Sequence, residues 1–135
     1  MKTIEVVAAV IKDNDLFLAT QRGYGEFKGM WEFPGGKIEP LENKKDALVR
    51  EIKEELNADI TVDKYLCTVE YNYPTFHLIM YTYICSLISK RIENVKHNDI
   101  ELEHEDYKWL KLENIDKVEW LPADIEIVNK LKTNS

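Results

Sequence analysis

The sequence predicts an α/β fold, in which strands and helices mix around one sheet. Three segments carry this prediction. Residues 4–11 are apolar and largely β-branched, as in a buried strand. Residues 43–57 place apolar side chains at helical spacing, and residues 60–84 contain two further long strand patterns. A chain of 135 residues suits one core, so residues 1–135 are expected to form a single domain.

The first strand leads into a hairpin and a loop. Residues 12–15 form a polar turn, and residues 16–20 are expected to pair back onto the first strand. Residues 21–30 contain three glycines and few aliphatic side chains, which predicts a loop.

A short strand at residues 31–33 is expected to stop at Pro34, because proline cannot donate to a ladder. Gly35 and Gly36 follow at once. Two glycines permit a positive φ and a close backbone approach, so this point is predicted to be a turn before the helix.

The helix after this turn has recognisable ends. Asn43 suits the N-cap, with Asp46 three residues later as a weak capping box. Asn57 suits the left-handed residue that closes a helix. The side chains expected to pack inward share one face and are Ala47, Leu48, Ile52 and Leu56.

The second half of the chain supplies the remaining elements. Their patterns predict, in order, strands at 60–73 and 76–84, a polar loop or weak edge at 86–98, a short strand at 107–110, a helical turn at 112–115 and a helix at 122–132. Pro122 near the first position of the last helix is typical of a helix start.

Composition excludes some classes of partner. The chain has 18 basic and 25 acidic residues, a net charge of −7, so neither a long nucleic acid nor a membrane surface is expected to bind. The N-terminus does not resemble a signal peptide, and no apolar run is long enough to span a bilayer. Cys67 and Cys85 are isolated thiols, which favours buried core residues in a reducing cytoplasm over a disulfide or metal role.

The central helix is unusually acidic on one side. Glu51 and Glu55 are four residues apart and share a face, which Glu54 borders. Each like-charged pair destabilises a helix by about 0.2–0.5 kcal/mol, and Arg50, four residues before Glu54, offsets part of this. One interpretation is a solvated face laced by basic side chains, namely Lys44, Lys45, Arg50 and Lys53.

The second interpretation is a cation site. Hard divalent cations take oxygen ligands, and Mg²⁺ commonly takes one or two carboxylates together with substrate phosphates. The glycine turn before the helix can add a backbone carbonyl at the same point. A bound ion would then relieve the repulsion among the glutamates.

The segment from Gly36 to Ala58 resembles the Nudix box, the motif of the Nudix hydrolases. The motif runs Gly, five residues, Glu, seven residues, Arg-Glu, an aliphatic, any residue, Glu-Glu, any residue, Gly and an aliphatic. The matching positions are Gly36, Glu42, Arg50, Glu51, Ile52, Glu54 and Glu55. Asn57 and Ala58 depart from the motif at the helix exit, away from the carboxylates.

The flanks of the box resemble the MutT-type nucleoside triphosphate pyrophosphohydrolases, including CTP pyrophosphohydrolases. The similar segments are residues 20–22, 31–39 and 120–125. The resemblance implies a Nudix-type α/β/α sandwich around a mixed sheet. It also implies hydrolysis of a nucleoside triphosphate to the monophosphate and pyrophosphate, with Mg²⁺ as cofactor and Mn²⁺ as the alternative. Oxidised or modified dGTP and CTP- or dCTP-like nucleotides are the expected substrates, in nucleotide-pool sanitation.

Other outcomes stay open at this stage. The substrate could be another nucleoside-diphosphate-linked compound, such as a sugar or a dinucleotide. A non-catalytic nucleotide sensor would keep the fold but is expected to lose box carboxylates, and none is missing. The sequence does not distinguish a monomer from a homodimer.

The resemblance also assigns roles around the metal. Glu51, Glu54 and Glu55 would hold the ion with help from the backbone of Gly35 and Gly36, and one of the carboxylates, first Glu51, would instead act as base on the metal-bound water. Arg50 would orient the glutamates. Two further acids each keep two interpretations. Glu42 either binds a further metal through water or favours the positive helix end, and Glu103 is either a last ligand or part of a solvated acidic loop.

Substrate-binding residues are expected on both sides of the box. Arg22 and Lys37 are the best phosphate partners, because a polyphosphate needs cationic donors, and the alternative for each is an ordinary surface residue. The Gly35 backbone is also expected to contribute to substrate binding. Phe76 either stacks on a base or belongs to the core. Asp124 resembles the position of a base-reading Asn; its carboxylate either accepts from an exocyclic amine or is a first-turn helix acid.

Overall fold

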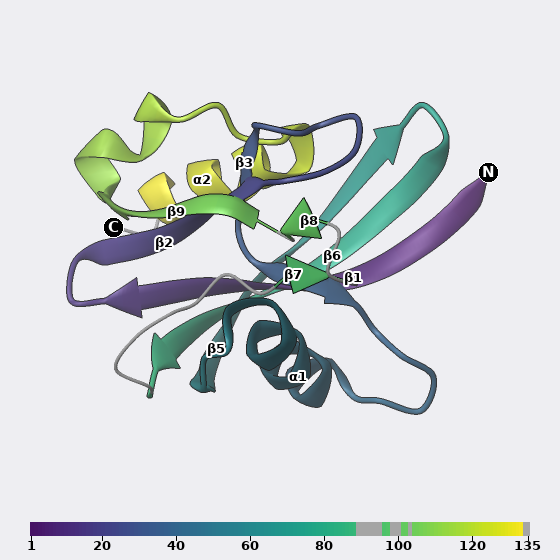
Figure 1. Ribbon diagram of the computed structural model, residues 1–135, viewed down its shortest axis with the longest axis horizontal. Helices are drawn as coiled ribbons and strands as arrows, with labels where there is room; N and C mark the ends of the chain where they lie inside the picture. The colour runs from purple at the N-terminus through teal and green to yellow at the C-terminus, as the bar shows by residue number, and fades with distance from the viewer. Residues whose placement is uncertain (89–95, 98–100, 103, 134–135) are drawn as a thin grey trace.

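One mixed sheet lies between two helices (Figure 1). The computed structural model describes residues 1–88, 96–97, 101–102 and 104–133. Within these residues, β1 (Lys2–Asp13) and β6 (Phe76–Leu87) pair in parallel, and the other strands of the sheet pair antiparallel. Helix α1 (Lys44–Leu56) covers one face and α2 (Pro122–Thr133) covers the other. The predicted α/β/α sandwich is therefore confirmed.

The central strand order is β3-β2-β1-β6-β5, with β4 added to β1 and β9 added to β2. The remaining elements are β2 (Leu16–Arg22), β3 (Trp31–Glu32), β4 (Gly35–Lys37), β5 (Ile60–Tyr73), β7 (Lys96–His97), β8 (Glu101–Leu102), β9 (His104–Lys111) and the 3₁₀ helix η1 (Leu112–Lys117). In the described part of the chain, neither helix is long and apolar enough to cross a membrane.

Strand β1 fills both layers of the core. Val7, Ala9 and Ile11 pack on the α1 side, whereas Ala8 and Val10 pack on the α2 side. All five are buried. Because helices cover both faces of the sheet, this strand is a continuous apolar run rather than an alternating one.

Helix α1 begins and ends where the sequence predicts. The Asn43 side chain accepts a hydrogen bond from the Asp46 amide (2.8 Å), and Asn57 closes the helix at φ 49° and ψ 40°. The Asp46 carboxylate accepts from the Asn43 side-chain amide, so the capping box is formed only on one side. The predicted inward face is confirmed by the burial of Ala47, Leu48, Ile52 and Leu56.

Gly35 and Gly36 are the main correction to the sequence interpretation. They do not form a turn with positive φ; they lie in β4, paired with Ala8 and Val7 of β1. The predicted close approach is real, because an added Cβ at Gly35 would lie 2.8 Å from the Ala8 Cα and closer still to the Val7 carbonyl oxygen. A strand can come this close only without a side chain, so the glycines serve packing rather than turning.

Several strand boundaries also differ from prediction, among them the ends of β2 and β6 and the start of β9, which begins at His104. Strand β2 continues to Arg22 because its last residues pair with β9, so the loop begins later than expected. Strand β6 continues to Leu87 because it pairs with both β1 and β5, which removes Ser86 from the predicted loop.

We expect Gly35→Ala to destabilise the fold by about 3 kcal/mol, because the new Cβ would overlap backbone atoms that cannot rotate away. Gly36→Ala is the matched control. Its Cβ would meet the Glu51 side chain, which can move, so a loss within about 1 kcal/mol is expected. Urea unfolding of both variants measures the difference, and equal losses would contradict this account.

Candidate active site

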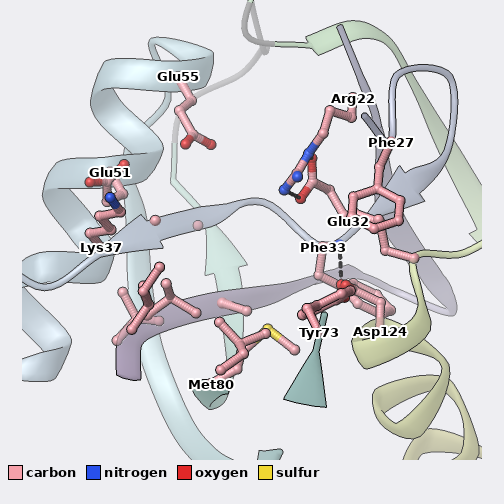
Figure 2. Close-up of a pocket in the computed structure, with 18 of the residues that line it drawn as sticks. Arg22, Phe27, Glu32, Phe33, Lys37, Glu51, Glu55, Tyr73, Met80 and Asp124 are labelled. Carbon is pink, nitrogen blue, oxygen red and sulfur yellow. Dashed lines mark hydrogen bonds and ion pairs between the residues drawn. The ribbon is translucent and has the colours of Figure 1, made fainter. Parts of the chain in front are cut away.

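A cavity of about 550 Å³ opens beside β1 and reaches from α1 to the start of α2 (Figure 2). This volume is within the usual range of small-molecule sites, about 300–1,000 Å³. The floor is apolar and includes Val6, Ala8, Leu78 and Met80. One end is polar and anionic, lined by Gly35, Gly36, Lys37, Glu51 and Glu55. The other end is lined by Arg22, Tyr24, Phe27, Glu32, Phe33, Tyr73, Phe76 and Asp124.

Two glutamates of α1 form the wall of the anionic end. Glu51 and Glu55 are one helical turn apart and both line the cavity, and Glu55 is only 8% exposed. Burial raises the pKa of Glu51, opposed by Arg50 and reinforced by the nearby Glu54 charge. Glu54 lies outside the cavity lining and is largely exposed.

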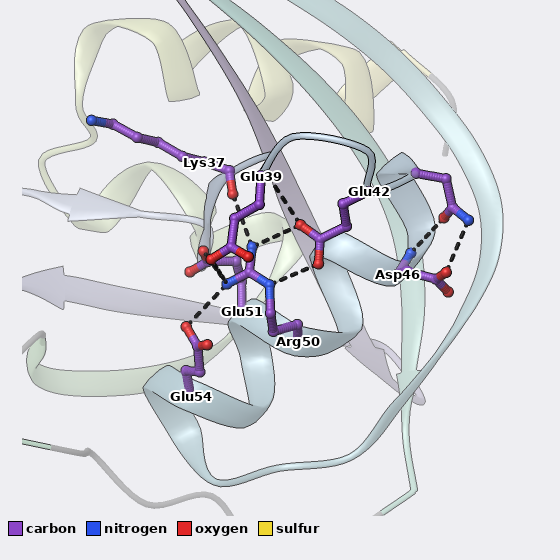
Figure 3. Close-up of polar contacts among 8 residues, drawn as sticks. Lys37, Glu39, Glu42, Asp46, Arg50, Glu51 and Glu54 are labelled. Carbon is purple, nitrogen blue, oxygen red and sulfur yellow. Dashed lines mark hydrogen bonds and ion pairs between the residues drawn. The ribbon is translucent and has the colours of Figure 1, made fainter.

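Arg50 gathers the other acids of this region (Figure 3). Its Nε and Nη2 donate to both oxygens of Glu42 (2.8 and 2.9 Å). Its Nη1 donates to Glu51 (2.9 Å) and Glu54 (3.1 Å), and Nη2 also donates to the Lys37 carbonyl oxygen (3.1 Å). The hydrogen bonds that Arg50 donates to Glu42 raise its pKa most, and those that it donates to Glu51 and Glu54 raise it further. Burial acts in the opposite direction. One guanidinium therefore fixes three carboxylates and ties β4 to α1.

The lysines of α1 do not play this part. Lys53 pairs with Asp59 (3.4 Å), and Lys44 lies over the Tyr81 ring (4.5 Å). Of the basic side chains in the solvated-face interpretation, Arg50 is the one whose described contacts reach the glutamates, whereas Lys53 and Lys44 make their described contacts elsewhere.

The donor set of the anionic end fits a hard divalent cation. Glu51 and Glu55 offer carboxylate oxygens to the cavity, and Gly36 lies against Glu51 so closely that a Cβ would occupy the space of its carboxylate. No three His, Cys, Asp and Glu side chains converge as a complete metal site in the residues that the structure describes. Mg²⁺ needs fewer protein ligands than that, because water and substrate phosphates complete its shell.

Asp124 sits at the opposite end, held against the short strand β3. Trp31 donates from its backbone to Glu119 (2.8 Å) and accepts from Leu121 (2.8 Å), which brings the start of α2 beside β3. The Phe33 amide then donates to the Asp124 carboxylate (2.9 Å). Asp124 is 5% exposed, so it is not an ordinary solvent-facing helix acid.

The charge state of Asp124 follows from its surroundings. Burial and the Glu32 carboxylate raise its pKa well above the usual range, and the Phe33 hydrogen bond and Arg22 only partly oppose them. A protonated carboxyl can donate as well as accept a hydrogen bond, whereas a carboxylate only accepts.

Arg22 and Glu32 form a two-point ion pair across β2 and β3. Arg22 Nη2 lies 2.6 Å from Glu32 Oε1, and Nε lies 2.9 Å from Oε2. The sequence interpretation missed Glu32. The sequence did contain a signal for Glu32. Successive side chains of a strand point to opposite faces, and Trp31 and Phe33 are both buried, so the residue between them points to the other face.

Aromatic rings surround the same end. Tyr73 contacts Phe27 (5.5 Å between ring centroids) and stacks on Phe76 (5.1 Å, 24° between planes). Its hydroxyl accepts from the Ala123 amide (3.3 Å), which ties the β5-β6 hairpin to α2. Phe76 thus serves both the cavity lining and the core.

The structure brings most predicted site residues to one cavity. Those that line it are Arg22, Gly35, Gly36, Lys37, Glu51, Glu55, Phe76 and Asp124. Arg50 and Glu54 are not part of the lining, and Arg50 donates to both Glu51 and Glu54. Glu42 accepts from Arg50 and from the Glu39 amide, which lowers its pKa. Glu103 lies outside the described residues.

We expect Asp124→Asn to stabilise the protein above the folded-state pKa of Asp124. The raised pKa means that the stability contributed by this carboxyl is fully present below about pH 3.9, its unfolded value, and is lost as the pH rises through the folded value. Asn stays neutral and keeps an oxygen for the Phe33 amide. The gain should shrink as the pH falls toward about 4.

Urea unfolding of wild type and Asp124→Asn between pH 4 and 8 measures this difference, with Asp116→Asn as an exposed control. A difference that does not change with pH, or a less stable variant at pH 8, would contradict the raised pKa.

Comparison with known proteins identifies the family of this chain. A family model described as NUDIX domain matches residues 1–131. A CTP pyrophosphohydrolase from Escherichia coli (strain K12) is 48% identical over 69 residues, which are 50% of this chain and 51% of that protein. The match thus spans about half of that relative. An 8-oxo-dGTP diphosphatase from the same strain is 25% identical over 98% of each chain.

Solved structures match over almost the whole chain. The NMR structure of MutT, a Nudix hydrolase from methicillin-resistant Staphylococcus aureus 252, has 38% identity and a TM-score of 0.73, with 100% of both chains covered. The E. coli ORF135 protein has 31% identity and a TM-score of 0.79, covering 98% of this chain and 91% of that one. The chain therefore belongs to the NUDIX domain family, and MutT-type Nudix hydrolases are among the proteins that it resembles.

Proposed function

We propose that this enzyme hydrolyses a nucleoside triphosphate to the monophosphate and pyrophosphate, with Mg²⁺ as cofactor and Mn²⁺ as the alternative. The observation that carries the proposal is the division of one cavity into two ends. The carboxylates of Glu51 and Glu55 and the side chain of Lys37 lie at one end, and aromatic rings with a buried carboxyl lie at the other. A triphosphate joined to a base by a sugar has the same two-part chemistry.

At the anionic end, Glu51 and Glu55 would hold the cation, with Glu54 and the Gly36 backbone completing the protein's share. The bound ion would neutralise phosphate charge and acidify a water. Lys37, which lines the cavity, would pair with a phosphate oxygen as a point charge. Glu51 is our first choice for the carboxylate that acts instead as the base on the attacking water, because it lines the cavity and burial raises its pKa.

Arg50 would act through the glutamates. Because its N–H groups are directed to Glu42, Glu51, Glu54 and the Lys37 carbonyl, we assign it to orienting these groups rather than to touching substrate. Glu42 then serves as the anchor of Arg50. A further ligand from Glu103 stays a proposal from the family resemblance.

At the other end, Phe76 and Phe27 offer faces on which a base can stack, and Asp124 offers a carboxyl beside them. The carboxyl can accept from an exocyclic amine, which cytosine and guanine both carry, and in its neutral form can also donate. We therefore propose oxidised or modified dGTP, or CTP- and dCTP-like nucleotides, as substrates. The names of the two E. coli relatives support this choice.

The proposed setting is nucleotide-pool sanitation in the cytoplasm by a single domain of residues 1–135. Both cysteines are free thiols, and burial raises the pKa of Cys85 to about 12, which suits a reducing compartment. The net charge of −7 disfavours a long nucleic acid or a membrane as partner. A monomer and a homodimer are both compatible with this activity.

The function is tested by pyrophosphate release from a panel of ordinary and oxidised NTPs and dNTPs, with Mg²⁺, with Mn²⁺ and with EDTA. We expect metal-dependent release of pyrophosphate from at least one modified dGTP or cytidine triphosphate. Nucleoside-diphosphate sugars and dinucleotides belong in the same panel. Turnover of those compounds alone, or none at all, would overturn the proposed substrate class.

We expect Glu55→Gln to lower kcat by at least about 100-fold with the fold intact, because one neutral oxygen replaces a cavity-facing carboxylate. Glu54→Gln should also lower kcat strongly if it shares the cation. Glu126→Gln on the exposed face of α2 is the control and should turn over like wild type. Unchanged kcat in both Glu54→Gln and Glu55→Gln would remove the mechanism.

A further inference from the structure

Arg22 is held more rigidly by its neighbours than phosphate binding requires. Glu32 accepts from its Nε and Nη2 in a fork-to-fork arrangement, and the guanidinium carbon lies 5.2 Å from the centre of the Tyr24 ring. Carboxylate pairing along one edge and an aromatic ring on one face fix the guanidinium plane. The entropy of ordering this long side chain is therefore lost before any ligand binds.

This ion pair is also shielded from solvent. The exposed fractions of the two side chains are 26% for Arg22 and 13% for Glu32. Interactions between charges at such a site are stronger than on an open surface. The Glu32 carboxylate therefore cancels most of the positive charge that Arg22 could offer to a polyphosphate.

The pair lies at the end of the cavity that carries Asp124 and Tyr73. The Arg22 charge affects the titration of both groups. Figure 2 shows Arg22 and Glu32 on the Phe27 side, across the cavity from Glu51 and Lys37. The Glu32 hydrogen bonds use Nε and Nη2, so Nη1 is the part of the guanidinium that Glu32 does not engage.

We propose that Glu32 is a positioning residue that acts through Arg22: it holds the guanidinium at the base end of the cavity, so that Arg22 selects the base rather than binding the triphosphate. The proposal rests on the function proposed above and changes the role first expected for Arg22. With Asp124 beside it, the site would favour a base edge that carries a carbonyl acceptor close to an amine.

The test uses two probes that separate the ends of the cavity. Nucleoside monophosphate, CMP or 8-oxo-dGMP, reports on the base end, and pyrophosphate reports on the phosphate end. Calorimetric titration of each probe at one fixed Mg²⁺ concentration gives its Kd. Variants Glu32→Ala, Glu32→Gln and Arg22→Lys are compared with wild type, and thermal unfolding confirms that each variant is folded.

We expect Glu32→Ala to weaken monophosphate binding by about tenfold or more, with pyrophosphate binding unchanged. Glu32→Gln should recover part of the loss, because it keeps one oxygen that can accept from Arg22. Arg22→Lys should resemble Glu32→Ala, since it keeps the charge but loses the planar fork. If Glu32→Ala does not fold, Glu32→Gln and Arg22→Lys still give the comparison.

Two results would overturn the proposal. Pyrophosphate binding weakened as much as monophosphate binding would return Arg22 to the phosphate end. Monophosphate binding unchanged in folded Glu32→Ala would show that Glu32 does not position Arg22. Binding is measured without turnover, so a wild-type protein that binds the monophosphate through Glu32 but releases no pyrophosphate would reject the proposed function and not this inference.

Discussion

The site depends on the hydrogen bonds that the Arg50 guanidinium donates to its neighbours. It joins Glu42 before α1, Glu51 and Glu54 on α1, and the Lys37 carbonyl at the end of β4. Without the Arg50 guanidinium, the negatively charged glutamates would repel one another, and the β4 backbone would lose its hydrogen bond to α1. A guanidinium suits the position because its five N–H donors are arranged in one plane. A lysine could balance charge here but could not hold several acceptors in fixed directions.

The two ends of the cavity are built in different ways. The anionic end is fixed by side chains around Arg50 and by the close approach of β4 to β1, which leaves room only for glycine at position 35. The other end is fixed by backbone hydrogen bonds between Trp31 and the segment before α2. Under the proposed function, substitutions at Glu32 or Asp124 would therefore change substrate specificity without disturbing the carboxylates of α1.

Local signals predicted much of this fold. The Asn43 cap, the left-handed Asn57 and the inward face of α1 depend on neighbours in sequence, and all three are confirmed. The pairing of Gly35 and Gly36 with β1 was not predicted. A two-glycine segment after proline has the composition of a turn, and only the partner strand, far away in sequence, makes it a strand.

Part of the candidate site was also predicted from local sequence signals. The motif spacing located Glu51, Glu55 and Arg50, because they share one helix and its entry. The ion pair of Arg22 with Glu32 and the burial of Asp124 arise from long-range contacts among β2, β3 and α2. Such contacts leave little trace in local composition. The exposure of Glu54 likewise follows from the direction in which α1 faces the sheet, whereas its ion pair with Arg50 was expected from their four-residue spacing on the helix.

The central claim is that the carboxylates of α1 accept a divalent ion which they share with a triphosphate. Thermal unfolding with a non-hydrolysable nucleoside triphosphate analogue, in Mg²⁺ and in EDTA, tests it most directly. The account predicts a rise in Tm when analogue and Mg²⁺ are both present, little change with either alone, and no such coupling in Gly36→Ala, where the new Cβ would displace Glu51. An equal rise in Tm in EDTA would contradict it.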